Sequence, residues 1–212
     1  MIFIETRNAE LRVPSRDNLK IWTTWVNSEF VRRTVPSTRI PHTIDLQWEF
    51  IQESLASKKR ILLEIWSKST TSFLGVVSLS EINNQNRSAQ IATISPTNKR
   101  NRNMFLIYEA RQEIVKYAFQ DLNLNKVWGE MLYPENKGFL ANNMCLGFKI
   151  EGVNIDSFWF NNEAKMSIRY YITRKQFNSM ENQNENIENL LCKENRIKNR
   201  NKIEYFIKNL DL

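Results

Sequence analysis

The chain has very few of the residues that build disulfide frameworks and metal sites. It contains two cysteines, Cys145 and Cys192, which lie far apart, and a single histidine, His42. A disulfide-stabilised fold and a zinc site each require several such residues at characteristic spacings. We therefore expect neither a disulfide nor a bound metal.

Long apolar runs are also missing. No run approaches the roughly 18 residues that a membrane-spanning helix requires. The amino terminus carries Glu5, Arg7 and Glu10 before any apolar block forms, so it does not resemble a secretory signal. These absences predict a soluble protein with a cytoplasmic location and no membrane partner.

Positive charge is in excess, and it is unevenly distributed. The formal net charge is +7, whereas residues 178–212 hold equal numbers of acidic and basic side chains, so the excess lies in residues 1–177. A basic surface suits either nucleic acid or an anionic cofactor. Because the sequence has no helix-turn-helix, zinc-finger or aromatic RNA-binding signature, nucleic acid is the weaker interpretation.

The length suits one domain with an appendage, since 212 residues bury one sizeable core. After Phe177 the composition changes to Asn, Glu and Lys. We therefore expect a domain over residues 1–177 and a helical C-terminal appendage over 178–212, with short amphipathic helices around Ile187 and Ile203. The appendage either folds back on the domain or contacts a partner, such as a second copy in a homodimer.

Hydrophobic periodicity indicates which segments form strands and which form helices. The strands are expected at 3–6, 10–13, 61–66, 72–79, 88–94, 126–132, 156–160 and 166–172, the central three forming an antiparallel meander. The helices are expected at 44–55, 106–122, 137–146 and in a segment that reaches Val26 and is capped by Ser15 or Asp17. Pro36 and Pro41 bound a loop that we expect on the substrate side.

The stretch from Tyr117 to Gly152 is the most informative part of the chain. It combines a helix end, a strand, Asn136 and, eleven positions later, the motif GFKIEG at 147–152. This arrangement resembles the acyl-CoA-binding half of the GNAT acetyltransferase superfamily, and the resemblance runs from Leu11 to about Phe177. It implies an α/β (α+β) fold whose mixed, mostly antiparallel sheet is splayed between its fourth and fifth strands and flanked by helices. It also implies an enzyme that uses acetyl-CoA as its acetyl donor.

The same resemblance implies where the cofactor binds. Relatives hold its pyrophosphate with a glycine-rich loop before a helix, where backbone N–H groups and the positive helix end meet the phosphates. Here Phe105 and Ile107 stand at the two glycine positions. A solvated basic turn is the competing interpretation of residues 99–102. The candidate cofactor-binding residues are Lys99, Arg100, Arg102, Asn103, Met104 and Asn136.

Candidate catalytic residues follow from the resemblance as well. Asn143 stands seven positions after Asn136, where many relatives have the tyrosine that protonates the departing thiolate. An amide cannot act as an acid at neutral pH, so the thiolate is either stabilised by hydrogen bonds or protonated by water, and Tyr133 is a further alternative. Glu81, near the end of a strand, is either the base that takes the amine proton or a solvated charge. Gly75, within the same strand, marks either a close backbone approach or a bend.

The acceptor is expected to be a small-molecule amine. The segment from Trp25 to Arg33 resembles enzymes that acetylate nucleotide-linked amino sugars of the pseudaminic-acid pathway, and also the N-terminal acetyltransferases of ribosomal proteins. An amino-sugar N-acetyltransferase is therefore the first hypothesis; a protein or peptide Nα-acetyltransferase and a non-catalytic binding module of the same fold are the alternatives. The candidate substrate-binding residues are Trp25, Arg32 and His42.

Overall fold

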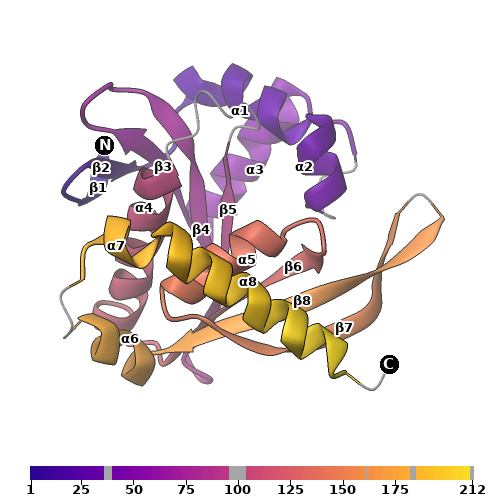
Figure 1. Cartoon of the computed structure of the whole chain (residues 1–212). Coiled ribbons are helices and arrows are strands. Elements are labelled where there is room, and N and C mark those ends of the chain that lie inside the picture. Colours follow the sequence, from indigo (N-terminus) through magenta and orange to yellow (C-terminus); the bar gives the residue numbers. More distant parts are fainter. Residues whose placement is uncertain (36–39, 96–103, 161, 182–184, 211–212) are drawn as a thin grey trace. The chain divides into compact units, whose positions relative to one another are not determined.

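The computed structural model describes residues 1–35, 40–95, 104–160, 162–181 and 185–210 (Figure 1). The chain forms two compact units, Met1–Gly129 and Glu130–Leu212. Each unit is described by itself below. The sequence-based boundary after Phe177 separates a domain from its appendage, which is a different division, and it stays a prediction.

A meander of antiparallel strands forms the centre of the first unit. Its strands are β1 (Ile2–Glu5), β2 (Ala9–Arg12), β3 (Ile61–Ser67), β4 (Phe73–Asn83) and β5 (Ser88–Ile94). Each is antiparallel to the next, as the periodicity predicts. The sixth strand, β6 (Lys126–Tyr133), pairs in parallel with β5, and the boundary between the units falls within it. In order of hydrogen-bonded neighbours the sheet is β1-β2-β3-β4-β5-β6-β8-β7.

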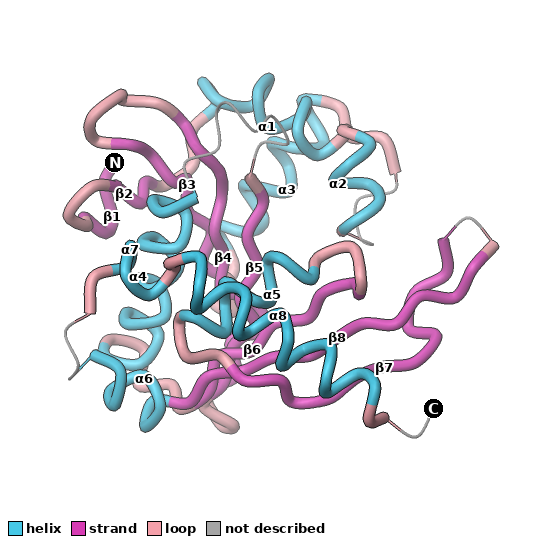
Figure 2. The backbone as a smooth tube through the Cα atoms, in the orientation of Figure 1, coloured by secondary structure: helices cyan, strands magenta, loops and turns pink. Residues whose placement is uncertain are grey.

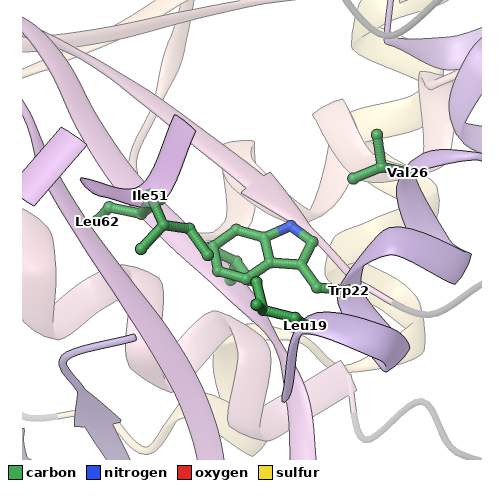
Figure 3. Packing of buried hydrophobic residues seen from close by; sticks show 6 residues of the cluster. Leu19, Trp22, Val26, Ile51 and Leu62 are labelled. Atoms are coloured by element: carbon green, nitrogen blue, oxygen red, sulfur yellow. The ribbon is translucent and has the colours of Figure 1, made fainter. Parts of the chain in front are cut away.

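Helices cover both faces of this meander. One face packs against α1 (Leu19–Val26) and α3 (Ile44–Ala56), and the other against α4 (Met104–Gln120). The short helices η1 (Arg16–Asn18) and α2 (Glu29–Thr34) contact α1. Neighbouring side chains of a strand point to opposite faces of the sheet, so Val76 and Val77 of β4 pack on opposite faces. On the first face Val76 and Leu62 join a core with Trp22 and Ile51 (Figure 3).

The residues at the N-termini of α3 and α1 can be compared with the predicted helix caps. Thr43 caps α3, since its hydroxyl accepts a hydrogen bond from the backbone N–H of Leu46 at 3.2 Å. Ser15, one of the two expected caps, occupies the cap position of the 3₁₀ turn η1, which runs directly into α1. Its side chain makes no capping hydrogen bond, since its hydroxyl donates to the Asp17 carboxylate instead. The short helix α2 was not expected.

In its described residues the second unit contains a long hairpin and several helices (Figure 2). The hairpin strands β7 (Lys149–Phe160) and β8 (Glu163–Thr173) are antiparallel and longer than the expected pair at 156–160 and 166–172. The helices are α5 (Lys137–Cys145), α6 (Arg174–Glu181), α7 (Ile187–Leu190) and α8 (Lys193–Lys208), of which α6 was not expected. Within the described ranges, no helix is long and apolar enough to cross a membrane.

Candidate active site

The carboxyl-terminal part of β5 has a free edge in the first unit. Its pairing with β4 runs from Ser88 to Ile94, whereas its parallel pairing with β6 covers three residue pairs and ends where Gln90 meets Trp128. The early end of this ladder agrees with the expected splay of the sheet. Backbone N–H and C=O groups along such an edge can hydrogen-bond an extended ligand.

β4 and the end of β5 approach each other closely at Gly75. A Cβ atom on Gly75 would lie 2.7 Å from the carbonyl oxygen of Ile94 and 3.3 Å from the Cα of Ser95. Of the two interpretations of this glycine, the close approach of two backbones is therefore confirmed. The absent side chain lets β4 support the end of β5, immediately before the expected cofactor loop.

Glu81 lies at the other end of β4. Its φ is +51°, and the β4–β5 register shifts between Ser80 and Asn83, so Glu81 belongs to a β-bulge beside the hairpin turn. The carboxyl end of β5 pairs instead with Val76. The β4–β5 register thus places Glu81 near the start of β5, which is paired with strands on both sides, and away from the free edge at the end of β5. The role of Glu81 as a base stays a prediction.

Three aromatic rings from three elements stack in one row. Phe73 of β4 stacks on Trp25 of α1, with ring centroids 4.6 Å apart, and on Trp66 of β3, with centroids 5.7 Å apart. The guanidinium carbon of Arg12 lies 4.4 Å from the Trp66 ring centroid. We call Trp25, Phe73, Trp66 and Arg12 the aromatic ladder. All four side chains are half-buried, and the Arg12 guanidinium also pairs with the Glu10 carboxylate at 2.6 Å, so the ladder offers partly exposed aromatic surface whose terminal charge is compensated.

The buried carboxyl group of Glu64 is hydrogen-bonded to one member of the aromatic ladder. Glu64 is 1% exposed, and its carboxylate accepts hydrogen bonds from Trp66 Nε1 at 2.9 Å and Asn18 Nδ2 at 2.8 Å. Burial raises the pKa of Glu64 above its usual value, although these hydrogen bonds and the charge of Arg12 act in the opposite direction. Sequence reasoning missed Glu64. Its one signal was a single acidic residue inside an apolar strand.

The other two candidate substrate-binding residues lie on and after α2. Arg32 is exposed on α2. His42 is held by its backbone, because its N–H donates to Asn27 Oδ1 at 2.9 Å and its carbonyl accepts from Asn27 Nδ2 at 2.7 Å. Its ring atom Nδ1 is buried and has no hydrogen-bond partner in the described part of the chain. Their roles in substrate binding stay predictions.

The expected cofactor loop leads into the first turn of α4. Lys99, Arg100, Arg102 and Asn103 lie outside the described residues, and Met104 is the first residue of α4. At the two positions where relatives have glycine, Phe105 is 38% exposed while Ile107 is buried at 3%. Ile107 therefore packs into the core. The first turn of α4 carries no acidic residue, so its positive end is left uncompensated.

The second unit holds the residues expected beside the thiolate. Tyr133 ends β6, and Asn136 occupies the cap position of α5. Asn143 is fully buried, and its side chain donates back to the carbonyl of Phe139 at 3.0 Å. The Asn143 amide is therefore hydrogen-bonded within its own helix. An amide also cannot donate a proton to the thiolate as an acid. Tyr133, which is half-exposed, stays the alternative donor of a proton.

Comparison with known proteins identifies the fold. A family model described as an acetyltransferase (GNAT) domain matches residues 9–149. The spermidine N-acetyltransferase from Vibrio cholerae in complex with CoA and spermine superposes with a TM-score of 0.70 and 20% sequence identity, covering 81% of this chain and 99% of that chain. A probable acetyltransferase superposes with a TM-score of 0.69 and 18% identity, covering 83% and 98%. At such identities the shared feature is the fold. No match was found among curated proteins.

Proposed function

Since this chain belongs to the acetyltransferase (GNAT) domain family and is an acyltransferase that uses acetyl-CoA, we propose that it acetylates the primary amine of a small molecule that carries a ring. A nucleotide-linked amino sugar is the first candidate. The observation that supports a ring-containing acceptor is the aromatic ladder, because stacked, half-buried rings suit the flat apolar face of a sugar or a base.

The reaction needs few groups from the protein. The amine nitrogen attacks the acetyl carbonyl, the C–N bond forms, the C–S bond breaks, and the thiolate leaves with the electron pair of that bond. Backbone N–H groups at the free edge of β5 are the candidates to polarise the carbonyl. Because Glu81 lies at the paired end of β5, it is the candidate acceptor of the amine proton only through intervening water, and Tyr133 or water is the candidate donor to the thiolate.

A polyamine is the second candidate acceptor, because one of the similar structures is a spermidine N-acetyltransferase bound to spermine. Polyamines carry several positive charges and no ring. The Arg12 guanidinium at the end of the aromatic ladder is paired with the Glu10 carboxylate at 2.6 Å, so the preference for a ring-containing acceptor rests on the stacked rings and not on charge. An amino-terminal peptide amine is the remaining alternative.

Steady-state kinetics on Trp25→Ala tests the ladder. With a UDP-linked amino sugar as acceptor, we expect the KM for the sugar to rise about tenfold, as expected for the loss of roughly 1.4 kcal/mol of stacking. The KM for acetyl-CoA should change little. Trp159→Ala is the matched control, because Trp159 is a largely exposed tryptophan outside the ladder. An unchanged sugar KM in Trp25→Ala would remove the support for a ring-containing acceptor.

A further inference from the structure

The C-terminal helix α8 packs along α5 through specific polar contacts (Figure 1). Asn199 of α8 is 8% exposed, and its Nδ2 donates to the carbonyl of Ala141 at 3.4 Å and to the sulfur of Cys145 at 3.3 Å. Lys137, at the start of α5, forms an ion pair with Glu204. The two helices are therefore joined at both ends of α5.

The side of α5 that packs against α8 includes small residues, which allow the two helices to lie close together. Its members Lys137, Gly138, Ala141 and Cys145 recur at helical spacing. A Cβ atom on Gly138 would lie 3.4 Å from the guanidinium of Arg200, so the small residue leaves α8 just enough room. The side chain of Asn143 is not on this side, since it donates to Phe139.

Apolar burial adds to these polar contacts. Ile203 of α8 is fully buried, and Leu191, just before α8, is 1% exposed. Residues 178–212 lie beyond the family match, which ends at residue 149. The similar structures are covered almost completely by 80–83% of this chain, so part of this chain has no counterpart in them.

We propose that α8 is a positioning element of the enzyme and that Asn199 is the residue through which it fixes α5. The proposal rests on the proposed function, since α5 begins at Asn136, the expected contact of the pantetheine arm. Holding Ala141 and Cys145 in place fixes the whole helix, because α5 is short and rigid. The appendage then sets the affinity for the cofactor without touching it.

Calorimetric titration of CoA into the full chain separates positioning from mere stabilisation. In Asn199→Ala we expect the Kd for CoA to rise about three- to tenfold, the range that loss of one buried hydrogen bond produces. The binding stoichiometry should stay unchanged. A purely structural role would lower the stoichiometry, through an unfolded fraction, and leave the Kd as it is. Asn201→Ala is the matched control, an exposed asparagine on the same helix.

A double-mutant cycle tests the contact itself. If Asn199 acts through Cys145, the combined variant Asn199→Ala with Cys145→Ala should raise the Kd by less than the product of the two single effects. Equal Kd values for Asn199→Ala and Asn201→Ala would overturn the proposal. Failure of the proposed function looks different: the wild-type chain would bind CoA yet acetylate none of the candidate amines. A wild-type chain that does not bind CoA would refute both.

Discussion

Replacing Gly75 with alanine should displace the end of β5. The added Cβ would stand 2.7 Å from the Ile94 carbonyl oxygen, well inside the roughly 3.5 Å at which such atoms attract each other best. The closest neighbour, the Ile94 carbonyl oxygen, and the Ser95 Cα are backbone atoms, so rotation of a side chain cannot relieve the clash. Overpacking of this kind costs about 1–3 kcal/mol.

Gly152→Ala is the matched control for this substitution. Gly152 also lies in a strand, but a Cβ there would meet no atom within 4 Å. Both substitutions restrict the unfolded chain equally, which stabilises each variant by about 0.4–1 kcal/mol. The difference in unfolding free energy between the two variants therefore isolates the backbone clash, and we expect it to be about 1–3 kcal/mol.

Urea denaturation measures this difference, and calorimetry with CoA measures its functional effect. In Gly75→Ala we expect a lower unfolding midpoint and weaker CoA binding, because the end of β5 moves just before the cofactor loop. Gly152→Ala should retain the wild-type Kd. The reasoning fails if the two variants have equal stability, since the close approach of β4 and β5 would then carry no cost.

Three further substitutions have defined outcomes. The raised pKa of Glu64 means that the folded state binds its proton more tightly than the unfolded state, so its contribution to stability is present below pH 4.5 and is lost as the pH rises through the folded pKa. Relative to wild type, Glu64→Gln should therefore gain stability with rising pH in urea titrations; a constant difference would contradict this. Gly147→Ala, at φ +84° and facing Met180, should lose about 1–3 kcal/mol in the same assay, and a loss no larger than that of Gly152→Ala would refute it. Tyr133→Phe should lower kcat about tenfold or more if Tyr133 protonates the thiolate, whereas an unchanged kcat would favour water.

Local sequence patterns predicted most of the helices and strands correctly. Thr43 before an apolar stripe marks the start of α3, and the alternating segments at 61–66, 72–79 and 88–94 correspond to β3, β4 and β5. The short helix α2 was not predicted, because its six residues span too few turns to show a hydrophobic period. The loop from Lys99 to Asn103 lies outside the described residues, so its predicted role stays a prediction.

The candidate site was harder to predict because its contacts join distant residues. Glu64 is stabilised by Asn18, 46 positions earlier, and nothing in the sequence around either residue indicates this pairing. Trp25 and Phe73 likewise stack although α2, α3 and β3 lie between them in the chain. Periodicity identifies such residues as buried or exposed, but only the register of the strands brings them together.

A competition experiment tests the central claim most directly. The full chain is incubated with limiting acetyl-CoA and an equimolar mixture of a UDP-linked amino sugar, spermidine and an amino-terminal peptide, and the acetylated products are identified by mass spectrometry. We predict that CoA is released and that the amino sugar carries the acetyl group. Acetylation of spermidine or the peptide alone would contradict the proposed acceptor, and CoA binding without any acetylated amine would contradict the proposed N-acetyltransferase activity itself.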